Sequence, residues 1–298
     1  MGVRPDWHAQ TARLGLARRR SDNMVHGKPV IKSVELPNQV RLPYAEQGHS
    51  SSLPVVLLHG FADSWRSFEL VLPHLPEAIH AFALTLRGHG DASRPATGYG
   101  VRDFAADLAN FQDAMRLRGA VIVGHSMGSA VAVRFAIDRP ERTMGLVLVG
   151  ASPTIAGTAA AREIWDSTIS KLTDPVDPAL VRVMSESMLA RPVPPAFLDV
   201  AVGEGLKVPA FVWKAAFESR RRLEGEYAAE LGKIKAPTLI VWGDQDVRYP
   251  RDEQEKLASA IAGSRLIAYH GAGHFLHWEE PRRFASDLVI FVEGLSER

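Results

Sequence analysis

The stretch that decides the fold is Ala120–Ser129, which reads AVIVGHSMGS. Four apolar residues run directly into the pattern Gly-x-Ser-x-Gly, and residues 130–137 continue with the composition of a buried helix. A buried strand, a sharp turn and a helix in this order form a nucleophile elbow, which exposes the hydroxyl of its serine. Gly124 and Gly128 allow strand and helix to approach closely, because neither places a Cβ in the corner. The five-residue pattern also occurs in ordinary turns, so the assignment of Ser126 as a nucleophile depends on the rest of the chain.

Length and composition restrict the class of protein. A chain of 298 residues with 46% hydrophobic residues fits one large α/β domain, or a core with a subdomain. The net charge of +1 gives no electrostatic reason to expect binding to nucleic acid or to an anionic membrane surface. The absence of cysteine excludes disulfides, a thiol nucleophile and thiolate metal sites, and it fits a cytoplasmic location.

The N-terminal stretch does not look like part of the core. Residues 1–28 are polar and rich in arginine, and we interpret them as an N-terminal arm. No apolar segment follows the arginines at positions 18–20, so a secretory signal is not expected. No apolar run approaches the ~20 residues that a membrane helix requires, so no membrane span is expected.

The remaining chain alternates between apolar runs and amphipathic stretches. Strands are predicted at residues 29–36 and 39–46, which form a hairpin, and at 53–58, 79–86, 120–123, 144–149, 237–242 and 265–269. Helices are predicted from about residue 63 to 72, at 101–117 and 130–137, ending at 257–262, and at 284–295. This alternation predicts an α/β fold with a mainly parallel, doubly wound sheet covered on both faces.

One long segment breaks the alternation. Residues 152–235 contain no clear strand, several prolines and six aromatic residues, and we predict that they form a helical cap inserted between two strands. The α/β core then consists of residues 29–151 and 236–298. A plain structural insertion is the alternative for this segment.

Polar, glycine-containing loops follow four of the predicted strands. They are residues 59–61 (HGF), 124–126 (GHS), 243–246 (GDQD) and 271–274 (GAGH). In open parallel sheets the reacting groups gather at the carboxyl ends of the strands. The loops supply a serine, then acids, then a histidine, which is the chain order expected after a nucleophile elbow.

With these four motifs the chain resembles the α/β-hydrolase family from about Val30 to the C-terminus, in particular its serine esterase- and lipase-like branch with a helical cap. The motifs are His-Gly at 59–60, Gly-His-Ser-Met-Gly at 124–128, Gly-Asp-x-Asp at 243–246 and Gly-x-Gly-His at 271–274. One departure is visible, because Thr85 stands where such sequences often carry an aspartate. We expect this departure to change only local hydrogen bonding.

The resemblance implies a catalytic triad. Ser126 would be the nucleophile, His274 the general base and Asp246 the acid that orients the histidine. Asp244 is the alternative acid, although it could instead brace its loop. The oxyanion hole would use the backbone N–H groups of Phe61 and Met127.

Several other polar residues near these motifs have a less direct expected role. The side chain of His125 must point away from that of its neighbour Ser126. His277 is expected to pack or to face solvent, and His59 to hold the shape of its loop. Glu279 and Glu280 are interpreted as the solvated start of a helix near Pro281.

A serine at the elbow favours attack on a carbonyl carbon, because relatives that open epoxides or displace halide carry an aspartate there. We therefore predict a carboxylic-ester hydrolase that acts on a small-molecule ester through an acyl-enzyme, as a monomer or homodimer. Phe61, Trp165 and Trp213 are the candidate substrate-binding residues. No metal site and no dinucleotide loop is visible, so no cofactor is implied.

Three alternatives retain the same residues. The first two are a lactonase and a hydrolase of carbon–carbon bonds, the latter requiring a positive group for a substrate carboxylate. Arg191 or one of Arg220–Arg222 could supply this group, although a solvated helix face also explains the arginine run. The third is a small-molecule sensor that does not turn over its ligand.

Overall fold

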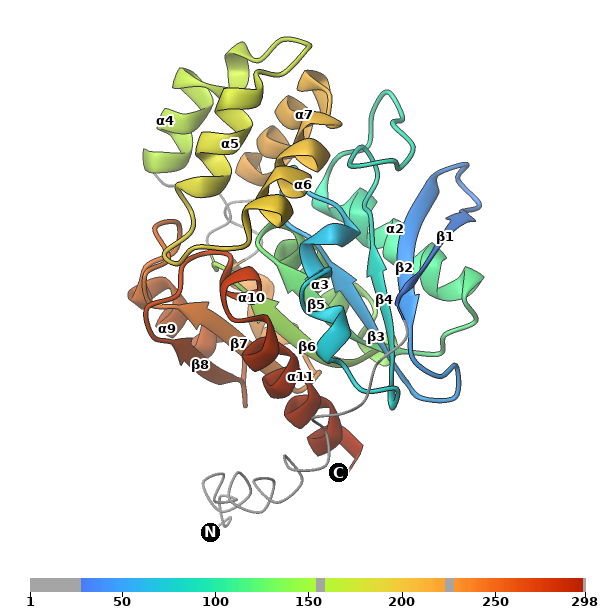
Figure 1. The fold of residues 1–298 in the computed structure, drawn as a ribbon. Helices are drawn as coiled ribbons and strands as arrows, with labels where there is room; N and C mark the ends of the chain where they lie inside the picture. The colour runs from blue at the N-terminus through green and yellow to red at the C-terminus, as the bar shows by residue number, and fades with distance from the viewer. Residues whose placement is uncertain (1–27, 154–158, 223–227, 297–298) are drawn as a thin grey trace.

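The computed structural model describes residues 28–153, 159–222 and 228–296. The predicted N-terminal arm therefore lies almost entirely outside the described residues. Eight strands form one sheet in the order β1-β2-β4-β3-β5-β6-β7-β8 (Figure 1). β2 runs antiparallel to both of its neighbours, and β3 to β8 are mutually parallel. The strands are β1 (Val30–Glu35), β2 (Arg41–Gln47), β3 (Leu53–Leu58), β4 (Ile79–Leu84), β5 (Ala120–His125), β6 (Thr143–Val149), β7 (Thr238–Gly243) and β8 (Arg265–Tyr269).

The apolar runs form these strands because helices cover both faces of the sheet. Alternate residues of β3 enter two separate cores, Val56 and Leu58 on one face and Val55 and Leu57 on the other. The first face is covered by α2 (Val101–Ala114), α3 (Met127–Asp138) and α9 (Arg251–Ala260), and the second by α11 (Pro281–Ser296). The predicted doubly wound sheet is confirmed, and the strand ends differ from the predicted ones by two residues at most.

The prediction of a helix from about residue 63 to 72 is wrong, because this segment does not form a continuous α-helix. The structure has two 3-10 turns instead, η2 (Trp65–Phe68) and η3 (Leu72–His74). Ser64 caps the first turn by accepting a hydrogen bond from Arg66 N at 3.2 Å. Pro73 and Pro76 lack an N–H group and end the segment, which leaves too few residues for a stable α-helix.

A helical insertion, which we define as the segment between β6 and β7, contains α4 (Ala159–Ser167), α5 (Pro178–Glu186), α6 (Pro195–Leu206) and α7 (Ala210–Arg222). α5 and α6 each begin at a proline, whose fixed φ suits the first helical position. Figure 1 shows the four helices grouped together above the sheet. The shorter elements are η4 (Pro140–Arg142), η5 (Ile169–Lys171), η6 (Leu231–Lys233) and α10 (Leu276–Glu279).

The helical insertion contacts loops that follow the parallel strands. Trp213 of α7 lies 4.8 Å, between ring centroids, from Phe61 in the loop after β3. Met188 O accepts a hydrogen bond of 3.0 Å from His274 N in the loop after β8. The insertion therefore lies over the carboxyl ends of the strands, the edge at which parallel sheets place their reacting groups. No helix within the described ranges is long and apolar enough to cross a membrane.

A buried ion pair links α2 to the loop after β4. Arg87 donates two hydrogen bonds to Asp107, from Nε to Oδ2 and from Nη2 to Oδ1, each 2.5 Å long. The Asp107 side chain is only 1% exposed. We expect Asp107→Ala to lower the free energy of unfolding by about 3–5 kcal/mol, because it leaves a buried guanidinium without its partner. Asp113→Ala on the same helix is the matched control, since Asp113 pairs with Arg142 but is 65% exposed. Urea denaturation should show a change below about 1 kcal/mol for the control, and equal losses for the two variants would contradict the prediction.

Candidate active site

Ser126 lies between β5 and α3, and its backbone has a conformation that residues other than glycine rarely adopt. Its φ is 51° and its ψ is −111°. The surrounding structure holds this strained turn, because Ser126 N donates to Val149 O at 2.9 Å and Ser126 O accepts from Ser129 N at 3.0 Å. A Cβ on Gly128 would lie 2.3 Å from Leu58 O, so only glycine permits α3 to pack this closely on the end of β3. The half-buried Ser126 therefore occupies the tip of a nucleophile elbow.

His274 and Asp246 form a buried pair at the ends of β8 and β7. His274 Nδ1 lies 2.8 Å from Asp246 Oδ2, and the two side chains are 3% and 0% exposed. Asp246 Oδ1 accepts hydrogen bonds from the backbone N–H groups of Arg248 at 2.7 Å and Tyr249 at 3.2 Å, which fixes the carboxylate. Because Nδ1 faces a carboxylate, it carries the ring proton and leaves Nε2 as an acceptor.

The end of β6 lies between the serine and the histidine. Ser126 N donates to Val149 O, and a Cβ on the next residue, Gly150, would lie 3.0 Å from Nδ1 and Cε1 of His274. Within the described residues, Ser126 Oγ makes no hydrogen bond to His274. Hydrogen bonds between nucleophile and base are often long without substrate and shorten in the reacting complex. The lack of a hydrogen bond between Ser126 and His274 is therefore compatible with a catalytic pair.

The loop after β3 approaches the elbow from the other side. A Cβ on Gly60 would lie 3.4 Å from Ser126 Cβ, and Phe61 follows directly. The N–H of Phe61 has no acceptor among the described residues. Met127 is the first residue of α3, where N–H groups have no intrahelical acceptor. Among the residues that the structure describes, both backbone donors predicted for an oxyanion hole therefore lack an acceptor, and both lie close to Ser126.

The neighbouring histidines have structural contacts. His59 Nδ1 donates to Gly60 O at 2.6 Å, and its Nε2 accepts from Leu86 N at 3.0 Å, so it holds the loop after β3 as predicted. His125 Nε2 lies 3.1 Å from His274 O. His277 is fully buried, with its Nε2 3.1 Å from Ser67 Oγ, so it packs and does not face solvent.

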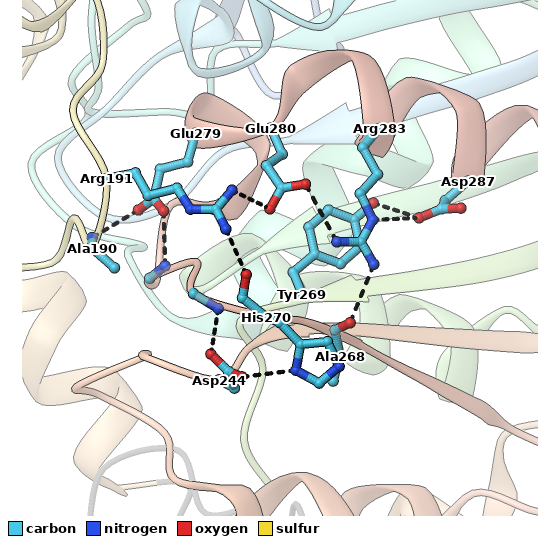
Figure 2. Close-up of polar contacts among 12 residues, drawn as sticks. Ala190, Arg191, Asp244, Ala268, Tyr269, His270, Glu279, Glu280, Arg283 and Asp287 are labelled. Carbon is cyan, nitrogen blue, oxygen red and sulfur yellow. Dashed lines mark hydrogen bonds and ion pairs between the residues drawn. The ribbon is translucent and has the colours of Figure 1, made fainter.

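Thr85, at the position where such sequences often carry an aspartate, forms a local hydrogen bond. Its Oγ1 accepts from Trp65 N at 3.2 Å at the start of η2. Asp244, the first acid of the Gly-Asp-x-Asp motif, also has a local role. Asp244 accepts from His270 Nδ1 at 2.9 Å and from Gly271 N at 2.7 Å, so it braces the loop after β8 (Figure 2).

The candidate substrate-binding aromatics belong to one row of rings. Phe61 lies edge-to-face against Trp213 at 4.8 Å and against Phe217 at 6.2 Å between centroids. Phe217 stacks on Trp165 at 6.0 Å. Trp213 is 1% exposed and donates its indole N–H to Val208 O. It is therefore a buried ring that packs against Phe61. Phe217 is not among the substrate-binding residues predicted from the sequence, because its ring contacts join two helices and a distant loop.

The structure corrects the interpretation of the two glutamates near Pro281. Glu279 is half-buried and accepts hydrogen bonds from Gly273 N and Ala190 N, each at 3.0 Å (Figure 2). Burial raises the pKa of Glu279, although the two N–H groups oppose that shift. Glu280 contacts Arg191 at 2.8 Å and Arg283 at 3.3 Å. Neither glutamate is a simple solvated helix start.

Arg191, a candidate partner for a substrate carboxylate, is occupied elsewhere. Its guanidinium contacts Glu280 and donates to His270 O at 2.6 Å (Figure 2). The side chains of Arg220–Arg222 lie outside the described residues. No group of three or more His, Asp or Glu side chains in the described part of the chain is placed to hold a metal ion.

Buried histidines make the stability depend on pH. Burial lowers the pKa of His59 and His125 well below the ordinary value, that of His89 to about 4 and that of His277 to about 3. The unfolded chain takes up these protons near pH 6.5 and the folded chain does not, so stability falls as the pH falls below that value. Burial raises the pKa of Asp63 to about 7 and also raises that of Glu279, and both shifts oppose the trend of the histidines.

We expect His277→Gln to reduce the dependence of the unfolding free energy on pH by about 1.4 kcal/mol per unit between about pH 4.5 and 6. The reason is that His277 is fully buried and neutral in the folded state. His49→Gln is the control, because the side chain of His49 is 70% exposed. Urea midpoints across this range provide the measurement, and an unchanged slope in His277→Gln would contradict the prediction.

Comparison with known proteins agrees with this architecture. Residues 54–281 match the family described as the alpha/beta hydrolase fold. The chain is 29% identical to a non-heme chloroperoxidase of Streptomyces lividans, over 84% of this chain and 95% of the relative. It is 27% identical to a 2-hydroxy-6-oxononadienedioate/2-hydroxy-6-oxononatrienedioate hydrolase of Paraburkholderia xenovorans, over 88% of this chain and 94% of the relative. An esterase from Rhodococcus sp. has a TM-score of 0.77 and 25% identity, with 89% of this chain and 99% of the esterase covered. The chain therefore belongs to the alpha/beta-hydrolase family, among its esterase- and lipase-like members.

Proposed function

We propose that the protein is a serine hydrolase that cleaves carboxylic esters through an acyl-enzyme, with Ser126, His274 and Asp246 as its catalytic triad. The observation that carries this proposal is the strained elbow at Ser126 beside a buried His274–Asp246 pair 2.8 Å apart. Strained backbone persists where the surrounding structure over-determines it, and such positions cluster at active sites.

The proposed reaction proceeds in two halves. Ser126 Oγ forms a bond to the ester carbonyl carbon, and its proton passes to His274 Nε2. The oxyanion accepts hydrogen bonds from the N–H groups of Phe61 and Met127 until the C–O bond to the alcohol breaks and His274 returns the proton to that alcohol. A water molecule then attacks the acyl-enzyme by the same route and releases the acid. Asp246 holds the tautomer of His274 and stabilises its charged form.

The helical insertion would serve as the cap of this site. It places the ring of Trp213 against Phe61, whose N–H is one of the proposed oxyanion donors. Trp165 and Phe217 extend the apolar row away from the elbow. An apolar wall of this kind favours esters with an apolar acyl or alcohol part, because burial of apolar area is the main source of binding energy.

The proposal is tested by measuring kcat/KM for a panel of substrates with one enzyme preparation. The panel contains p-nitrophenyl esters of increasing acyl length, an enol-lactone and a 2-hydroxy-6-oxo-dienoate whose hydrolysis breaks a carbon–carbon bond. We expect kcat/KM for the best ester to exceed that for the other two classes by about tenfold or more. Preferred turnover of the lactone or of the dienoate would replace the ester assignment. Tight binding without turnover of any member would indicate a sensor.

A further inference from the structure

A short segment of the helical insertion is docked on the loop that carries His274. This 188–191 segment, between α5 and α6, contacts the loop through backbone atoms. Met188 O accepts a hydrogen bond of 3.0 Å from the N–H of His274 itself. A Cβ on Gly273 would lie 2.6 Å from Met188 O and 2.7 Å from Ala190 N, so the two backbones touch without room for a side chain.

The carboxylate of Glu279 joins the same two backbones. Its Oε2 accepts from Gly273 N at 3.0 Å and its Oε1 accepts from Ala190 N at 3.0 Å. Gly273 is the residue before His274, and Ala190 lies 89 residues from Glu279 along the chain. Figure 2 shows the Glu279 side chain reaching from its helix toward Ala190. One half-buried carboxylate therefore links the 188–191 segment to the residue before His274.

A second contact closes the docked segment at its other end. Arg191 Nη1 lies 2.8 Å from Glu280 Oε1, and Arg191 Nη2 donates to His270 O at 2.6 Å. These bonds hold the segment at Arg191, but they involve neither Gly273 nor His274. The Arg191 side chain is 43% exposed and that of Glu280 is 17% exposed, so solvent screens this ion pair.

We propose that Glu279 is a positioning residue for the general base, because it couples the seating of the helical insertion to the placement of His274. The proposal rests on the proposed function, in which His274 accepts the proton of Ser126. Ser126 and His274 are not hydrogen-bonded in this structure, so small shifts of the loop change the distance that the proton must cross. Misplacement of a catalytic group by about 1 Å costs on the order of 10²-fold in rate.

The test is the rate at which Ser126 reacts with a p-nitrophenyl alkylphosphonate. Ser126 Oγ forms a bond to phosphorus, the P–O bond to p-nitrophenolate breaks, and the serine proton passes to His274. The amount of p-nitrophenolate released counts the reactive serines, and its time course reports the attack. A purely structural role would lower the amount and leave the rate constant of the folded fraction unchanged.

Glu279→Gln is the first variant, because the amide keeps the shape of the side chain but has one oxygen for two N–H groups. We expect its phosphonylation rate constant and its kcat to fall by about 10- to 100-fold, with KM within about twofold. Asp287→Asn is the matched control. Asp287 accepts from Tyr269 Oη at 2.6 Å in the same network and touches neither the histidine loop nor the 188–191 segment. It should keep the wild-type rate constant.

Gly273→Ala perturbs the same docking from the other side, and its Cβ would also lie 2.9 Å from Glu279 Oε1. Its Cβ would displace Met188 O and Ala190 N, so a similar fall in the rate constant is expected. A rate constant within about twofold of wild type in Glu279→Gln would overturn the proposal, whatever the rate constant of Gly273→Ala. Absence of phosphonylation in the wild-type enzyme would instead refute the proposed function. If Ser126 of the wild-type enzyme is phosphonylated and the rate constant of Glu279→Gln is unchanged, only the positioning role is refuted.

Discussion

Replacing Ser126 by alanine is expected to lower kcat for p-nitrophenyl acetate on the order of 10⁵- to 10⁶-fold. The variant removes the atom that would form the acyl-enzyme, and the remaining His274–Asp246 pair has no hydroxyl to activate. Residual rate above water would come only from the backbone donors and from substrate binding. The measurement is steady-state hydrolysis with purified variant, compared with wild-type protein prepared in the same way.

Ser129→Ala is the control for this variant. Ser129 lies on the first turn of α3, and its Oγ donates to Ser126 O at 2.5 Å, so it stands one turn from the proposed nucleophile. We expect it to retain activity within about tenfold of wild type. Activity in Ser126→Ala above about one hundredth of the wild-type rate would contradict the assignment of the nucleophile.

Replacing Asp246 by asparagine is expected to lower kcat by about 10⁴-fold. The side-chain amide can present its NH2 group to Nδ1 of His274, and the ring proton then moves to Nε2. A protonated Nε2 cannot accept the proton of Ser126. The backbone donors of Arg248 and Tyr249 can still hold the remaining oxygen, so the fold should survive.

Asp244→Asn is the matched control, since the two acids are two residues apart in one loop. Within the described part of the chain, Asp244 contacts His270 and Gly271 and makes no hydrogen bond or ion pair with His274. We therefore expect a loss of kcat below about tenfold. A larger loss in Asp244→Asn than in Asp246→Asn would reverse the assignment of the acid.

Much of the fold follows from local patterns in the sequence. The continuous apolar runs at β3 and β5 predict strands covered on both faces, and the structure buries both faces there. The nucleophile elbow follows from Gly124-x-Ser126-x-Gly128, because few other sequences allow so tight a corner. Near residues 63–72, local pattern was insufficient, since prolines further along convert the expected helix into two 3-10 turns.

The choice between Asp244 and Asp246 shows what local pattern leaves open. Both residues follow the same strand, and sequence alone favours Asp246 only through the family resemblance. The structure separates them by their partners, since Asp246 lies 2.8 Å from His274 whereas Asp244 holds His270. These partners come from the loop after β8, at least 26 residues away along the chain.

Glu279 is the residue for which local reasoning gave the wrong environment. An acidic pair before a proline is typical of a solvated helix start. The burial of Glu279 arises from the 188–191 segment, which comes from the middle of the helical insertion. The row formed by Phe61, Trp213 and Phe217 is non-local in the same way. Such contacts depend on how the insertion docks on the core, and no short-range pattern encodes that.

The proposed reaction passes through a covalent acyl-enzyme on Ser126. It is tested most directly by intact mass measurement of the protein quenched in acid during turnover of a p-nitrophenyl ester, followed by peptide mapping. We expect a mass increase of one acyl group on the peptide that contains Ser126, and no increase in Ser126→Ala. An acyl group on another residue would contradict the proposed mechanism. So would ester turnover without any acyl adduct, in a preparation whose Ser126 does form the phosphonate adduct.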